Sequence, residues 1–182
     1  MKTFRKAQGM QVATIAEGAI VGKLDDFQFD LETGRIYGWR LKGPGVFPRS
    51  GGVPASALVH IGRDLVLVKS EVAIEWAGGA RNQEEGRAWA SEYRGTTVMT
   101  RRGATLGAVE DYLIEADPPQ VRAMLVGGQH AVPFDPRVAT GKDAVILEED
   151  SLLQAVPEET GDSDTDWRTR LRGLFEATPE RR

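Results

Sequence analysis

The sequence predicts an all-β fold built from two copies of one small module, and three observations support this prediction. Short apolar runs recur about every 8 to 12 positions between turn-forming residues, a spacing typical of β-barrels and sandwiches. Several runs alternate apolar and polar residues, as half-buried strands do. The pattern of glycine, apolar and acidic positions in residues 9–41 also returns in residues 95–126.

The duplication extends over most of two stretches of similar length. With a one-residue gap near Ala16, the glycines, acidic-aromatic triplets and apolar runs align in the same order. A matched series of this kind is the signature of an internal repeat. The aligned pairs include Gly9 with Gly95, Gly18 with Gly103, Gly22 with Gly107, Asp25-Asp26-Phe27 with Glu110-Asp111-Tyr112, Val53-Pro54 with Val132-Pro133, and Asp64–Val68 with Asp143–Leu147.

In chain order, each copy predicts a glycine turn, an acidic-aromatic strand, a hairpin, a second strand, a Val-Pro bend and a final apolar strand. In RIYGWRL, alternation places Ile36, Gly38 and Arg40 on one face of the strand and the residues between them on the other. The final runs LVLV and AVIL are continuously apolar, which suits strands buried on both faces.

The acidic segment around DLETGRIYGWRL could be a catalytic cluster or a turn. Glu32-Thr33-Gly34 lies between two strand-like runs, and glycine supplies the positive φ that a hairpin loop with a bulge needs. The second copy has Asp117-Pro118-Pro119 here, a different turn chemistry. Because neighbouring strand residues point to opposite faces, Asp25 and Asp26 are not expected to share a proton or an ion. We therefore interpret the carboxylates as hydrogen-bond acceptors for turn amides.

Composition narrows the class of protein. The chain has 182 residues, no cysteine and a formal net charge of −4, so disulfides, thiolate zinc sites and a cysteine nucleophile are excluded. Residues 148–166 carry eight acidic and no basic side chains, which leaves the rest mildly basic rather than a nucleic-acid-binding surface. There is no apolar run of membrane-span length and no apolar stretch after the basic N-terminus. We expect a cytoplasmic protein, and the Arg-, Ala- and Gly-rich composition hints at a bacterial source.

These motifs resemble the PRC-barrel family, which includes the C-terminal domain of the ribosome maturation factor RimM and the cytoplasmic domain of the photosynthetic reaction-centre H subunit. The second copy departs from the pattern where Pro-Pro replaces Thr-Gly. The resemblance implies small β-barrels that bind other proteins or stabilise complexes, and its motifs are structural rather than catalytic. The matching turn residues are Gly18, Gly22, Gly34 and Pro54 in the first copy and Gly103, Gly107 and Pro133 in the second.

The expected organisation is a first PRC-type barrel in residues 1–76, a linker in 77–88, a second barrel in 89–150, and an acidic linker with a helix in 151–182. The linker is short, so the barrels should pack together as a pseudo-two-fold pair. In the tail, apolar residues fall at i, i+4, i+7 and i+8, which predicts a short amphipathic helix. These residues are Trp167, Leu171, Leu174 and Phe175.

The tail helix is the first candidate binding element. It could dock in a partner's groove through its apolar face, with Arg168 and Arg172 adding contacts to acidic groups. The alternatives are docking on its own barrels or in a homodimer, and, less favoured for a short helix after an acidic segment, contact with a membrane surface.

The second candidate is the loop Lys42–Gly52, which is six residues longer than its counterpart and contains Phe47 and Arg49. Binding residues concentrate on such loops, although added loop length is also well tolerated. His60 and His130 do not occupy equivalent positions and show no ligand spacing, so no metal site, cofactor or catalytic residue is predicted. Trp39, Trp76 and Trp89 are expected in the core or between the barrels.

The function predicted from the sequence is a non-enzymatic protein–protein interaction or scaffold module, with a protein partner or self-association and no direct nucleic-acid binding. An alternative, by family analogy alone, is a ribosome- or RNA-associated maturation factor. A small-ligand or enzyme role is third and would need a concave site with convergent polar groups.

Overall fold

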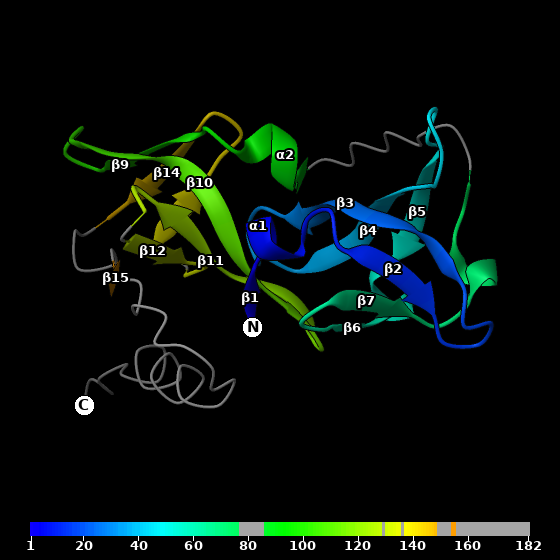
Figure 1. Cartoon of the computed structure of the whole chain (residues 1–182). Helices are drawn as coiled ribbons and strands as arrows, with labels where there is room; N and C mark the ends of the chain where they lie inside the picture. Colours follow the sequence, from blue (N-terminus) through cyan, green and yellow to red (C-terminus); the bar gives the residue numbers. More distant parts are fainter. Residues whose placement is uncertain (77–85, 129, 136, 149–153, 156–182) are drawn as a thin grey trace, which may run out of the picture.

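The computed structural model describes residues 1–76, 86–128, 130–135, 137–148 and 154–155, and these form two curled sheets that lie side by side (Figure 1). The strands run in the order β5-β4-β3-β2-β7-β6 in the first sheet and β13-β14-β9-β10-β11-β12-β15 in the second. The elements of the first copy are β1 (Lys2–Thr3), α1 (Phe4–Ala7), β2 (Gln11–Thr14), β3 (Ile20–Asp30), β4 (Ile36–Lys42), β5 (Ser50–Pro54), η1 (Ala55–Ala57), β6 (Leu58–Ile61), β7 (Leu65–Val68) and η2 (Glu71–Ala73). Those of the second copy are β8 (Arg87–Trp89), α2 (Ala90–Tyr93), β9 (Thr97–Thr100), β10 (Thr105–Ala116), β11 (Pro119–Val126), β12 (His130–Pro133), β13 (Val138–Thr140), β14 (Ala144–Leu147) and β15 (Gln154–Ala155).

The two sheets repeat the same strand pairing, which confirms the all-β tandem prediction. β2 pairs antiparallel with β3 and parallel with β7, and β9 pairs in the same two ways with β10 and β14. The expectation that LVLV and AVIL are buried on both faces is wrong. In β7, Val66 and Val68 are buried while Leu65 and Leu67 are half-buried, and Ile146 in β14 is 38% exposed. These strands have one face in the core and one face toward the surface.

Bulges break the expected alternation in β3 and β4. The register passes from Gln28 opposite Gly38 to Phe29 opposite Ile36, so Tyr37 is an extra residue in its strand. Ile36 is therefore buried in the core together with Trp39, rather than on the opposite face as alternation predicted. The bulge moves the Ile36 side chain to the other face of the strand, and the alternation of residues along the sequence does not reveal a bulge.

The N-terminal segment of each copy crosses to the sheet of the other copy. β1 pairs with β10, with Thr3 opposite Leu113, and β8 pairs with β3, with Trp89 opposite Gln28. These are equivalent pairings in the two copies. The short helices α1 and α2 follow directly and lie at the junction of the two sheets (Figure 1). Each sheet is therefore completed by the beginning of the other repeat.

One continuous hydrophobic core extends through both sheets. At the junction the Phe27 and Tyr112 rings, which occupy equivalent positions, meet edge to face with centroids 5.4 Å apart. Arg35 and Gln120, also equivalent, form a β-bridge. Contacts between equivalent residues are what a two-fold axis between the repeats requires, so the barrels pack as the expected pseudo-two-fold pair.

The described strands extend past two of the expected boundaries. β8 begins inside the range expected as linker, and β15 pairs with β12 beyond Asp150. Residues 77–85 of the linker and residues 156–182, including the predicted tail helix, lie outside the described part of the chain. Within that part, no helix is long and apolar enough to cross a bilayer.

Candidate functional site

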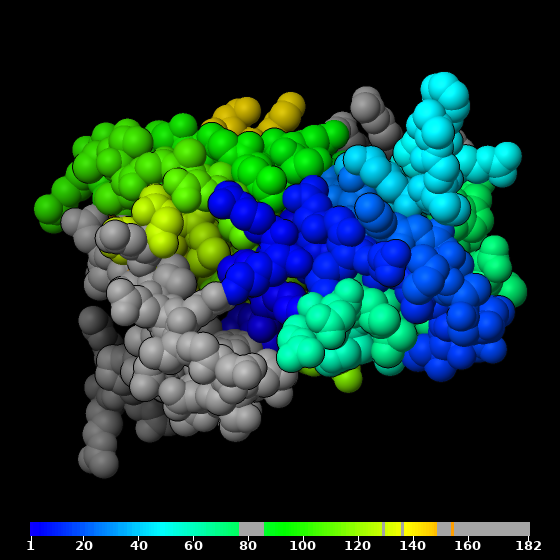
Figure 2. Space-filling model, viewed as in Figure 1, coloured from blue at the N-terminus to red at the C-terminus, as the bar shows by residue number. Residues whose placement is uncertain are grey.

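The β4–β5 connection, residues 43–49, projects from the first barrel as a narrow hairpin extension (Figure 2). It is shorter than the predicted loop Lys42–Gly52, because Lys42 ends β4 and Ser50–Gly52 belong to β5. The backbone N–H of Gly43 donates to the Arg49 carbonyl over 2.8 Å, which closes the hairpin below its tip. At the tip, Val46 is 88% exposed and Phe47 is 94% exposed. We name residues 44–48 the finger. An almost fully exposed aromatic ring gains nothing from burial in the isolated protein, so stability of the fold does not explain its placement.

The base of the finger is packed against Trp76. A Cβ atom on Gly51 would lie 2.8 Å from Cε3 of this indole ring, and one on Gly43 would lie 3.1 Å from Cζ3. Two glycines flanking the finger therefore leave room for the ring. Trp76 is held there by the bridge between Gly52 and Glu75. The tip is exposed while its base is anchored to the barrel.

The end of β2, the start of β3 and η2 lie at the end of the first barrel that is remote from the second barrel (Figure 1), and an exposed apolar side chain lies in or directly beside each of them. Ile15 is 54% exposed, Ile20 is 53% exposed and Val72 is 92% exposed. The aligned positions of the two isoleucines in the second copy are the polar residues Arg101 and Thr105. The fold therefore does not require apolar side chains here, and their presence is particular to the first barrel.

The acidic residues of β3 form a structural cluster. The guanidinium group of Arg40 contacts both Asp25, with Nε–Oδ2 at 2.7 Å, and Asp26, with Nη2–Oδ2 at 3.0 Å. The prediction that these neighbours point apart is wrong, because a bulge between Leu24 and Asp26 interrupts the alternation. Lys42 completes the cluster with an Nζ–Oδ1 distance of 2.7 Å to Asp25. Every carboxylate charge in the cluster is paired with a cation, which leaves no free general base.

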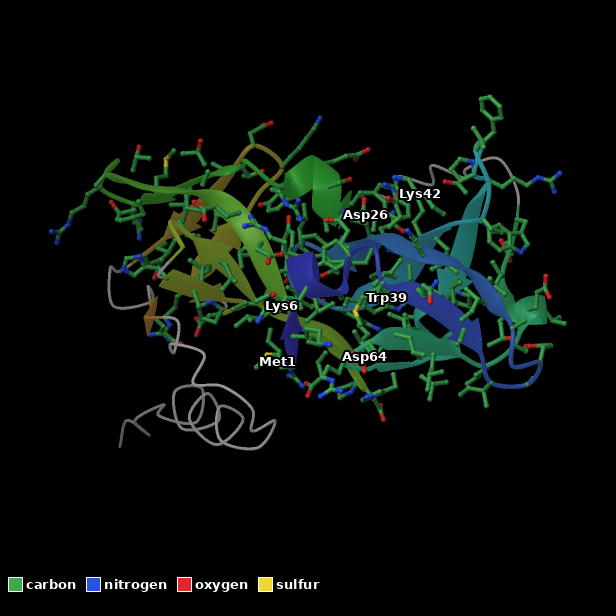
Figure 3. All side chains as sticks on the ribbon, in the orientation of Figure 1. Met1, Lys6, Asp26, Trp39, Lys42 and Asp64 are labelled. Carbon is green, nitrogen blue, oxygen red and sulfur yellow. The ribbon has the colours of Figure 1, made fainter. Side chains whose placement is uncertain are left out.

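Asp26 is fully buried and caps a helix of the other repeat. It accepts hydrogen bonds from the Ser91 backbone N–H at 3.1 Å and the Ser91 hydroxyl at 2.5 Å, at the first turn of α2 (Figure 3). The equivalent carboxylate, Asp111, accepts the Arg5 backbone N–H of α1 at 3.1 Å. Neither helix has a side-chain cap from its own N-cap residue. Each repeat thus supplies the cap for the other repeat's helix.

Burial has the largest effect on the pKa of both capping carboxylates, Asp26 and Asp111. It raises the pKa of Asp26 above the ordinary value of 3.8, although hydrogen bonds from Ser91 and Phe27 and the charge of Arg40 act in the other direction. Burial likewise raises the pKa of Asp111. For Asp25, burial is outweighed by the hydrogen bonds from Lys42 and Arg40, and its pKa is lowered. The raised pKa values of Asp26 and Asp111 follow from burial, and the lowered pKa of Asp25 follows from its hydrogen bonds with two cationic side chains.

The DLETG segment is a turn, as predicted. Oδ1 of Asp30 accepts the Glu32 and Thr33 backbone N–H groups at 3.1 and 2.7 Å, and Gly34 has φ +71°. The turn also docks on the second barrel, because the Gly34 carbonyl accepts the Val121 N–H at 2.8 Å. Asp30 therefore holds the turn, and the Gly34 carbonyl joins it to the second barrel.

The remaining candidate residues fall in separate places. Phe47 and Arg49 are exposed on and beside the finger, while Trp167, Leu171, Leu174, Phe175, Arg168 and Arg172 lie outside the described residues. His60 lies on β6 and His130 on β12, and the described residues contain no group of three or more side chains suited to a metal ion. The predicted turn residues Gly18, Gly34 and Gly103 lie between strands, and all have positive φ. The prediction is wrong for Gly22 and Gly107, which lie inside β3 and β10 beside bulges, where a positive φ is also found. Pro54 and Pro133 end β5 and β12, the first exposed and the second buried.

Sequence reasoning missed the crossing of β1 and β8 and the exchanged caps. The alignment could have been continued before Gly9, where Arg5 falls opposite Ser91, but no local pattern indicates which barrel a short segment joins.

Comparison with known families gives two matches to one model. The PRC-barrel domain model matches residues 1–75 and again residues 86–154, which together are well over half of the chain. No curated protein matches the sequence. The first match ends at the Glu75 bridge and the second ends at Gln154 in β15, the equivalent positions of the two sheets.

Proposed function

Because the chain belongs to the PRC-barrel family, with two copies of its domain, we propose that it is a non-enzymatic interaction module that binds a protein partner through the finger of its first barrel. The observation that carries this proposal is the finger itself. It places Val46 and Phe47 in solvent, 88% and 94% exposed, on a base anchored by Trp76.

The geometry suits insertion into an apolar pocket of a partner. Aromatic side chains that bury fully at an interface are typical hot spots, because they remove a large apolar area from water at little cost in side-chain entropy. The neighbouring Arg49 is exposed and can pair with a partner carboxylate at the rim. Ile15, Ile20 and Val72 are further exposed apolar side chains of the first barrel that a large partner can cover.

The finger and the exposed isoleucines of the first barrel have no counterpart in the second barrel, which supports a role for them other than building the barrel. The second copy joins β11 to β12 with a short turn, and its positions equivalent to Ile15 and Ile20 are polar. A feature found in one copy alone is not needed to build the barrel. We infer that the second barrel acts as the structural support and the first barrel presents the binding surface.

The test compares affinity capture from native lysate by the unmodified chain, the double variant V46S/F47S and the control I146S. The control removes an exposed apolar side chain from the second barrel, where Ile146 is 38% exposed. We expect the control to retain the partner and the finger variant to lose it. With the purified partner, the Kd should weaken at least tenfold, about 1.4 kcal/mol of binding free energy.

Both variants should keep the melting temperature of the unmodified chain, because an exposed side chain contributes little to folding. If V46S/F47S captures the same proteins at the same strength, binding does not involve the finger and the proposal is wrong. A captured set consisting of ribosomal particles, lost as salt rises, would instead favour the maturation-factor alternative.

A further inference from the structure

The second sheet carries a small hydrophobic cluster that is separate from the main core. Leu113, Ala123 and Ala131 are 8%, 0% and 1% exposed, and Met1 and Leu125 pack against them. These residues alternate with main-core residues such as Val126 and Val132, so they lie on the outer face of the sheet. We name this set, which spans β10, β11 and β12, the outer apolar face.

The first barrel has no such face at the equivalent positions. The cross-strand pair Leu113–Ala123 of the second barrel corresponds to the pair Gln28–Gly38 of the first. In the same way, the pair Leu125–Ala131 corresponds to the pair Arg40–Gly52. At these four positions the first barrel is thus polar or lacks side chains. There the Arg40 guanidinium lies 4.8 Å from the centroid of the Trp89 ring.

Burial differs between the equivalent positions as well. Gly52 and Pro54 on β5 are exposed, whereas Ala131 and Pro133 on β12 are buried. The two strands have the same neighbours, because β5 is bridged by Glu75 and β12 pairs with Gln154 at the equivalent position. Met1 packs against the outer apolar face, and this face is the part of the second barrel's outer surface that suits a further apolar segment.

The chain itself supplies an apolar segment within reach. Gln154 pairs with Ala131, so the chain leaves the described strands at the edge of this face. Eleven residues, 156–166, then separate Ala155 from Trp167, and this length of chain can span up to about 40 Å. The three strands of the face are only about 10 Å across.

We propose that the C-terminal segment Trp167–Phe175 docks as an amphipathic helix on the outer apolar face of the second barrel of the same chain. The predicted apolar side of this segment comprises Trp167, Leu171, Leu174 and Phe175. A helix is about 10 Å in diameter, which matches the width of three strands. The alanines at the centre of the face let its backbone approach closely, while Leu113, Leu125 and Met1 border it (Figure 3 labels Met1). This inference does not depend on the finger.

Disulfide trapping in the full chain tests the proposal. The chain has no cysteine of its own, so only the introduced pair can form a disulfide. L125C is combined with L171C on the predicted apolar side, or with T169C, which lies on the opposite side of the same helix. A third pair, Q28C with L171C, uses the first barrel. We expect an intramolecular disulfide in the first pair at least ten times faster than in either control.

Three results would overturn the proposal. Equal rates for L171C and T169C would show that no helix face is held on the sheet. A faster reaction for Q28C would place the segment on the other barrel. A disulfide-linked dimer as the main product of the first pair would show that the face receives the tail of a second copy.

A second measurement needs no substitution. Trypsin should cleave after Arg168, Arg170 and Arg172 of the unmodified folded chain at least tenfold more slowly than after Arg181, because a docked helix is protected. The variant A123R, which places a long charged side chain in the face, should remove this protection. Rapid cleavage at all four sites in the unmodified chain would contradict the proposal even if a cysteine variant failed to fold.

Discussion

At the scale of single residues, the junction depends on a few polar and glycine positions whose surroundings come from the other repeat. Asp26 and Asp111 are buried acceptors for helix N–H groups, and Gly34 allows a turn to lie against a neighbouring strand. Their energetic effects should therefore be measurable as changes in the stability of the whole molecule.

Replacing the capping carboxylates with amides should change how stability depends on pH. Because burial raises the pKa of Asp26 and Asp111 above 3.8 in the folded state, their favourable contribution is fully present below that pH and is lost as the pH rises through the raised pKa. In the variant D26N/D111N the amide groups do not deprotonate, so this loss of stability with rising pH does not occur. Relative to the unmodified chain, its free energy of unfolding should increase as the pH rises from 3.8 toward 7, measured by urea titration.

The control for this experiment is D135N. The Arg137 side chain holds the pKa of Asp135 below 3.8, so this carboxylate stabilises the fold above that pH and the effect is lost as the pH falls through its lowered pKa. The D135N variant should therefore lose stability relative to the unmodified chain as the pH rises. The same sign for both variants would contradict the assignment.

Substituting Gly34 should destabilise the junction. An added Cβ would lie 2.7 Å from both the Phe134 ring and the Val121 carbonyl oxygen, at a φ of +71°. Backbone strain and steric overlap together should cost G34A about 3 kcal/mol of unfolding free energy. The control G18A has a similar φ of +65° but no atom within 4 Å of the added Cβ, and it should lose only about 1 kcal/mol. Equal losses in chemical denaturation would show that the contact with the second barrel is unimportant.

At the scale of elements, α1 and α2 are too short to be stable by themselves. Each contains four residues, well below the roughly 12 to 15 that an isolated helix needs. They form because the strand before each one adds to the other repeat's sheet, which places the first helical turn against a buried carboxylate. Pairing and capping across the repeats therefore act as one unit.

A double-mutant cycle should detect this coupling. D26A removes the acceptor for the Ser91 N–H and hydroxyl, leaving buried donors without partners, and should cost about 2 kcal/mol. S91A removes part of the same contact, so the two losses should be non-additive by about 1 kcal/mol. The control cycle uses D64A instead of D26A, because Asp64 is largely exposed. The losses of unfolding free energy caused by D64A and S91A should be additive. Additivity in both cycles would contradict the capping role.

At the scale of the whole molecule, the two repeats share a core, so the barrels should not unfold separately. Phe29 contacts Tyr93 and Tyr112 across the junction, and Phe4 and Phe27 extend this cluster of edge-to-face and tilted rings within the first copy. Separating the barrels would expose all of these rings to water.

We expect a single cooperative thermal transition, with the calorimetric enthalpy equal to the van't Hoff enthalpy. Hydrogen exchange of β2 and β9 amides, one strand in each sheet, should report the same unfolding free energy, and D26A should lower both equally. Two resolved transitions, or a loss confined to one sheet, would show that the barrels are independent.

The amino-acid sequence by itself determined the all-β class, the duplication, the succession of strands and turns along each module and the turn at DLETG. These features depend on short-range causes: glycine at positions of positive φ, alternation of apolar residues and similarity between the two copies. The finger was also visible as extra length in one copy.

The tertiary structure alone decided which sheet β1 and β8 join, which faces Ile36, Asp25 and Asp26 occupy, and where the second copy carries an outer apolar face. A bulge shifts side chains without any signal in the period of the sequence. The choice between a segment's own barrel and its neighbour depends on free energies of long-range contacts, because a two- or three-residue strand carries too little pattern to specify its partner.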